Sequence, residues 1–125
     1  MSAASVATKE TTTSTAYTNL TTVGPSVTVT IPESGRALVV LTAAMFGSNG
    51  QASAFMSFEA SPKGTTTAPT DAQALEVTNN DESRASATVV ATGLTPGSTT
   101  FTAKYRVTSG LGTFSNRDIV VIPLP

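Results

Sequence analysis

The stretch that decides the fold is Ser26-Val27-Thr28-Val29-Thr30-Ile31. Its valine and isoleucine side chains alternate with serine and threonine, and a period of two places the apolar groups on one face of an extended chain. A strand with one apolar and one hydroxyl-bearing face is covered on a single side. The stretch therefore predicts an antiparallel strand that packs one face against a core.

The same alternation recurs at intervals of about ten residues, with glycine, proline or asparagine turns between the segments. A turn is expected at 47–50 and a long polar loop at 61–71. Short, evenly spaced strands without a helical period predict an all-β fold, a two-sheet antiparallel β-sandwich of about eight strands with jelly-roll or Greek-key topology. Besides 26–31, the expected strands are 36–46, 53–60, 74–78, 83–92, 101–107 and 114–124, with a weaker one at 14–20.

Two of these segments, 37–46 and 119–124, are apolar on both faces. Such a strand would be an aggregation hazard at an exposed edge, so we expect both to lie inside a sheet. One face would then pack in the core and the other against a second copy of the chain; alternatively, both faces lie within the core of one chain. The candidate oligomer or packing residues are Val39, Leu41, Met45, Val120, Ile122 and Leu124.

A chain of 125 residues suits one domain. Residues 1–13 are small and polar and show no period, which predicts a flexible N-terminal arm, or a strand formed late against a partner. Residues 14–125 are expected to form a single β-sandwich domain. The N-terminus lacks the pattern of a signal peptide, and the longest apolar stretch is about half of the ~20 residues that a spanning helix needs. We therefore expect no membrane association and no export signal.

The composition argues against most kinds of catalysis, metal binding and nucleic-acid binding. The chain has no cysteine and no histidine, the residues that most often act as nucleophile, general base and metal ligand. Seven basic and eight acidic residues are scattered, with no basic stripe of the kind that binds nucleic acid. The charged fraction of 12% is low for a free surface, which suggests that neighbours cover part of it. We expect no enzymatic activity, no cofactor and no nucleic-acid partner.

Two groups of carboxylates are the remaining candidates for chemistry. Asn79, Asn80, Asp81 and Glu82 could supply oxygens to calcium, but their spacing fits no calcium loop and turn propensity accounts for them. Asp71 and Glu76 flank a short strand, and a glycosidase pair there would lack any group to tune it. We expect no catalytic or metal-binding residues.

Taken together, several segments resemble small β-sandwich modules among the structural proteins of tailed bacteriophages, especially phages of actinobacterial hosts. The resemblance is carried by 14–20, 24–30, 35–43, 56–58, 93–97 and 113–124 and covers about residues 14–124. Such modules are similar to the trimeric jelly rolls of the complement-globular and tumour-necrosis families.

The resemblance implies a virion structural protein that forms a homotrimer. A short module with a polar arm and no shaft suits a capsid decoration protein, or minor capsid protein, made in the host cytoplasm and docked on the major capsid protein at the capsid surface. Modules of this type serve as fibre tips, head fibres or capsid decoration proteins. The alternative is a tail-fibre or minor tail protein that binds the host surface, and a third possibility is a generic adhesion or sandwich module of a bacterial protein.

Overall fold

The computed structural model describes residues 1–48, 52–62 and 67–125, so parts of the turn expected at 47–50 and of the loop expected at 61–71 lie outside the described residues. Apart from one short 3-10 helix, η1 (Asp71–Gln73), the regular elements of the described residues are strands. They are β1 (Ser2–Val6), β2 (Glu10–Thr12), β3 (Ser26–Ile31), β4 (Arg36–Gly47), β5 (Ala54–Pro62), β6 (Leu75–Val77), β7 (Ser83–Ala91), β8 (Gly97–Val107) and β9 (Gly112–Leu124).

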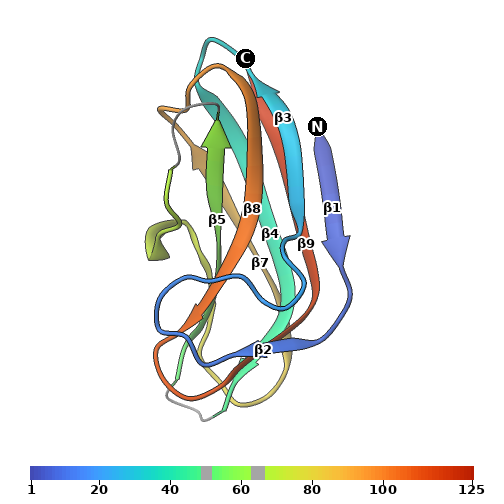
Figure 1. The fold of residues 1–125 in the computed structure, drawn as a ribbon, viewed down its shortest axis with the longest axis vertical. Coiled ribbons are helices and arrows are strands. Elements are labelled where there is room, and N and C mark those ends of the chain that lie inside the picture. The colour runs from blue at the N-terminus through green and yellow to red at the C-terminus, as the bar shows by residue number, and fades with distance from the viewer. Residues whose placement is uncertain (49–51, 63–66) are drawn as a thin grey trace.

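The strands form two antiparallel sheets that stack as a sandwich (Figure 1). One sheet has the order β1-β9-β4-β7, with β2 also paired to β9, and the other has the order β3-β8-β5-β6. Leaving out β2, the first strand pairs with the last, the second with the last but one, and so on inward to β5 and β6. This nested pairing is a long hairpin rolled into two layers, which confirms the predicted all-β sandwich with jelly-roll topology.

The two strands that are apolar on both faces lie inside a sheet. β9 pairs with β4 on one side and with β1 and β2 on the other, and β4 in turn pairs with β7. Burying both strands in the sheet interior leaves neither as an exposed edge.

A β-bulge in β9 changes which of its residues face the core. Thr42 of β4 pairs with Asp118, but Ala44 pairs with Ser115, so β9 contains one residue more than β4 over this span. Asn116 at this point has a φ of 47°, a left-handed conformation that asparagine tolerates better than most residues. Before the bulge an even-numbered residue, Phe114, faces the core, whereas beyond the bulge the odd-numbered residues of β9 face it.

The N-terminal segment differs from the expectation. Residues 1–13 were expected to form a flexible arm, but Ser2–Val6 pairs with β9 over 117–121, and Glu10–Thr12 pairs with it over 112–114. The segment is therefore part of the five-stranded sheet. The strand expected at 14–20 is also wrong: this segment is irregular, and only Thr18 forms a bridge, to Tyr105.

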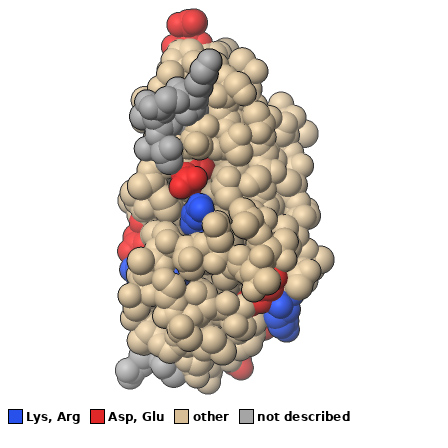
Figure 2. Space-filling model, in the orientation of Figure 1, with Lys and Arg blue, Asp and Glu red and all other residues tan. Residues whose placement is uncertain are grey.

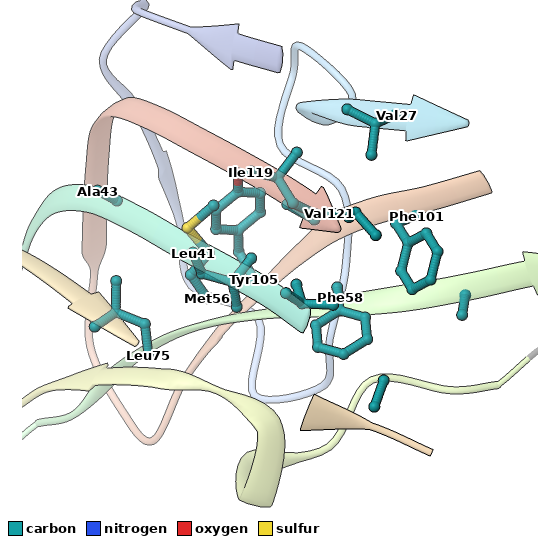
Figure 3. Packing of buried hydrophobic residues seen from close by; sticks show 14 of the residues in the cluster. Val27, Leu41, Ala43, Met56, Phe58, Leu75, Phe101, Tyr105, Ile119 and Val121 are labelled. Atoms are coloured by element: carbon teal, nitrogen blue, oxygen red, sulfur yellow. The ribbon is translucent and has the colours of Figure 1, made fainter. Parts of the chain in front are cut away.

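The core lies between the two sheets (Figure 3). Phe58 packs at 5.9 Å from Phe101 and Tyr105 at 4.9 Å from Phe114, measured between ring centroids. Aromatic rings at these separations and tilts attract each other beyond the effect of burial. Aliphatic side chains fill the space around them, including the fully buried Val39, Leu41, Met45, Met56, Ile119 and Val121.

The two faces of β9 predict losses of stability of different size when a charge is introduced. Val121 is fully buried, so Val121→Asp should lower the free energy of unfolding by about 4 kcal/mol or more, because it places an unpaired carboxylate in the core. The neighbouring Val120 is only half-buried on the other face, and Val120→Asp should cost about 1 kcal/mol. Urea unfolding of the two variants measures the difference, and equal losses would contradict the assigned orientation of β9.

Candidate interaction surface

The outward side of the five-stranded sheet carries a row of apolar side chains. The register aligns Val120 with Val40 across neighbouring strands, and Ile122 with Leu38 and then Val90. Most of them are half-buried, while Val90 is 51% exposed. We call Leu38, Val40, Val90, Val120, Ile122 and Leu124 the apolar outer face. A row of partly exposed apolar side chains on adjacent strands makes this face a candidate interaction site.

The structure separates the six residues predicted for oligomer or packing contacts into two groups. Val39, Leu41 and Met45 have no exposed surface and lie in the core of the single chain, so they are not available to a second copy. The other three, Val120, Ile122 and Leu124, belong to the apolar outer face.

Sequence reasoning missed three members of this face, although the signal for them was present. Leu38 and Val40 alternate with Val39 and Leu41 along the strand and so lie on its opposite face, and the alternation of 83–92 puts Val90 outward. Which face of β4 meets the core could not be read from a strand that is apolar on both sides.

The other end of the same sheet surface is polar. Arg84 donates to Asp118 at 2.9 Å, and Ser5 donates to the other oxygen of that carboxylate at 2.5 Å. Thr42 donates to the hydroxyl of Ser86 at 3.1 Å. The apolar outer face is thus bounded on one side by paired charges and hydroxyls, the arrangement of a core and rim in protein interfaces.

The outward side of the four-stranded sheet has a different character. Ser26 and Thr102 share a hydrogen bond of 2.9 Å, and Thr28 and Thr100 share one of 2.8 Å. Lys104 donates to Asn19 at 2.8 Å. Figure 2 shows scattered charged side chains with no extended patch of one sign on the face that it presents. This polar side is suited to contact with water.

A cluster around Arg106 of β8 brings together η1 and the segment around Tyr17. Its Nε and Nη2 donate to the two oxygens of Asp71 at 3.1 and 2.9 Å, and the hydroxyl of Tyr17 donates to Oδ1 of the same carboxylate at 2.6 Å. The guanidinium also lies 4.5 Å from the ring centroid of Phe55. The hydrogen bonds from Arg106 and then from Tyr17 hold the pKa of Asp71 below its ordinary value.

This geometry gives Asp71 a structural role. Its two oxygens are engaged by the arginine fork and by the phenol, and these contacts tie η1 and the segment around Tyr17 to β8. Glu76 is exposed on β6. The arrangement supplies a bidentate ion pair between Arg106 and Asp71.

The most deeply buried charge is Arg117, just beyond the bulge. Its side chain has no exposed surface, and Nη2 donates to Oε1 of Glu10, itself 10% exposed, at 2.6 Å. Nη1 donates to the carbonyl of Gly24 at 3.3 Å, and the guanidinium lies 5.2 Å from the ring centroid of Tyr105. Nε has no hydrogen-bond partner among the described residues. An inward arginine on a core strand is stable only because these groups surround it.

Glu10 and Tyr105 extend this network. Both oxygens of Glu10 accept from the backbone N–H of Thr22 at 3.1 Å, and the hydroxyl of Tyr105 donates to the Gly24 carbonyl at 2.8 Å. Burial raises the pKa of Glu10, but the hydrogen bonds from Thr22 and the charge of Arg117 lower it by more than burial raises it. The pKa of Glu10 is therefore lowered from its ordinary value of 4.5. Burial raises the pKa of Tyr105 to about 12.

The turn considered for calcium is occupied by internal contacts. Oδ1 of Asn79 accepts from the backbone N–H of Asp81 at 3.2 Å, and Glu82 pairs with Lys9 at 3.3 Å. Within residues 1–48, 52–62 and 67–125, no group of three or more acidic side chains is arranged to hold a metal ion. The described part of the chain also shows no pocket.

Comparison with protein-family models and with curated proteins gave no match to the chain. Among the residues that the structure describes, no helix has the length and apolar character needed to cross a membrane.

The buried ion pair predicts a large effect of neutralising one partner. Glu10→Gln keeps the shape of the side chain but leaves the Arg117 guanidinium buried without a counter-charge, so the free energy of unfolding should fall by about 3–5 kcal/mol. Adding Arg117→Met removes the uncompensated charge and should restore most of the loss. Urea unfolding measures both variants; a Glu10→Gln protein as stable as the wild type would contradict the assigned role.

The same pair predicts sensitivity to acid. Because the pKa of Glu10 is lower in the folded chain than in the unfolded chain, its stabilisation is present above about pH 4.5 and is lost as the pH falls through the folded value. Asp71 contributes in the same direction. Unfolding midpoints measured from about pH 7 to about pH 3 should fall for the wild type. The fall should be smaller in Glu10→Gln and in Asp71→Asn, each of which lacks one of the two carboxylates.

Proposed function

We propose that this protein is a non-enzymatic structural component of a virion, a capsid decoration protein that docks on the capsid surface and stabilises the shell. The observation that carries the proposal is the apolar outer face on a jelly-roll domain whose core is already complete on the other side of the same sheet. Apolar side chains that add nothing to the core of their own chain gain free energy only when another surface covers them.

The distribution of polar groups supports docking through this side. The apolar outer face contains no charged residue, whereas Arg84 and Asp118 lie beyond it on the same sheet. The hydroxyl-rich side of the four-stranded sheet would then face water. A protein bound in this way has one sheet surface covered by its partner and the other exposed to water. A covered surface needs few charged residues, which fits the low charged fraction of 12%.

The resemblance to phage structural modules supports the choice of the capsid as partner. The two paired sheets of the described residues enclose a complete core, so the domain can brace a neighbouring protein. The contacts that bind Asp71 and Glu10 within the chain favour a structural role over a catalytic one.

The proposal is tested with capsids assembled without the protein. Purified protein should cosediment with them to saturation and should raise the temperature at which they break open. The double variant Val40→Lys/Ile122→Lys places two charges in the apolar outer face and should lower the affinity by about a hundredfold or more, because it buries unpaired ammonium groups on docking.

A matched control uses the other sheet. Ser61 and Thr102 occupy diagonal outward positions on β5 and β8, so Ser61→Lys/Thr102→Lys adds the same charge in the same geometry. This variant should bind capsids as the wild type does. Binding to host cells without affinity for capsids would overturn the proposal in favour of a fibre or minor tail protein.

A further inference from the structure

The five-stranded sheet ends in a long strand whose outer edge is open. β7 pairs with β4 over nine residues, and it is the last strand on that side of the sheet. Among the described residues, no backbone group of β7 bonds to any segment other than β4. About half of its N–H and C=O groups therefore point away from the sheet without a protein partner.

The other edges of the sandwich are shorter or blunted. β6 has three residues and β1 has five, while β3 begins directly after Pro25 and is followed by Pro32. β7 contains no proline, carries a single charge at Arg84, and pairs with β4 without a register shift. A long, regular edge without these protective devices readily accepts another strand.

The side chains of β7 also remain incompletely covered on the core side. Ala85, Ala87 and Val89 pack against the core cluster but are only partly buried. A strand added beside β7 would cover both these apolar groups and the open backbone edge. The edge is thus unsatisfied in two respects, in hydrogen bonds and in apolar contacts.

We propose that the edge is occupied by β7 of a second copy of this chain, paired antiparallel about a twofold axis through Ala87. Directly opposite residues must lie on the same face of a sheet, so inward residues of one copy have to meet inward residues of the other. Centring the axis on Ala87 meets this condition and uses all nine residues of the strand.

The sequence of β7 is self-complementary in this register. Ala85 meets Val89 of the other copy on the inward face, and Ser86 meets Thr88 on the outward face. Arg84 meets the apolar Val90, so no like charges face each other across the axis. Small side chains inside and hydroxyl pairs outside are favourable cross-strand neighbours.

The pairing itself is argued from β7 alone. Its biological use, which is tighter binding to a capsid, rests on the proposed function. A twofold axis relating antiparallel strands is perpendicular to the sheet, so both apolar outer faces lie on the same side of one continuous sheet. Two linked docking faces would bind a repetitive shell more tightly than one. A twofold contact differs from the threefold assembly implied by the resemblance, and the mass of the assembly decides between them.

The test measures mass by sedimentation and light scattering at micromolar concentration. The wild type should have twice the mass of one chain. Ser86→Lys/Thr88→Lys places a lysine opposite a lysine twice across the axis and should weaken self-association about tenfold or more. Ser26→Lys/Thr28→Lys is the matched control, because these two exposed residues lie on the edge strand β3 of the other sheet. The control should keep the mass of the wild type.

A charge-reversal experiment separates edge pairing from misfolding. Ser86→Glu/Thr88→Glu alone should also dissociate, and mixing it with the lysine variant should restore a species with the mass of two chains, because each lysine then faces a glutamate. A wild type with the mass of one or of three chains, or a mixture that fails to associate while both variants unfold as cooperatively as the wild type, would overturn the pairing. A wild type that dimerises but does not bind capsids would count against the proposed function alone.

Discussion

The buried charge of Arg117 constrains much of this structure. Its counter-charge, Glu10, is 107 positions away in the sequence, so the ion pair can form only when β2 lies against β9. The same network includes the carbonyl of Gly24 and the ring of Tyr105, which connects the segment before β3 and the strand β8 to the same point. An arginine without these partners would be too costly to bury. The N-terminal segment is thereby held in the sheet by this ion pair as well as by backbone pairing.

Contacts between residues distant in sequence, such as this ion pair, also explain which parts of the fold could be predicted from the sequence and which could not. Alternation in 26–31 and 101–107 identified β3 and most of β8, because each strand is covered on one face only. The segment 2–6 escaped notice because its small residues lie at a sheet edge and are only partly buried. The bulge at Asn116 escaped notice for another reason: an inward arginine violates the apolar pattern, and its partner is distant in sequence.

The candidate surface was predictable to a similar extent. Apolar residues on both faces of β4 and β9 indicated that one face meets something other than the core of the same chain. Which face that is depends on the position of the second sheet, so Val39 was grouped with Val120 although they point in opposite directions. The open edge of β7 depends on sheet order, which local periodicity does not contain.

The nested pairing of the jelly roll has a consequence for synthesis on the ribosome. β1 and β4, which are made early, both await β9, which follows all the other strands. Until β9 emerges, the apolar residues of β4 lack their main neighbour, and the five-stranded layer cannot close. Folding is therefore expected to follow translation of β9 rather than to proceed strand by strand, and the many long-range pairings favour a slow final step. During elongation the apolar residues of β4 are therefore expected to stay exposed to other chains until β9 is made.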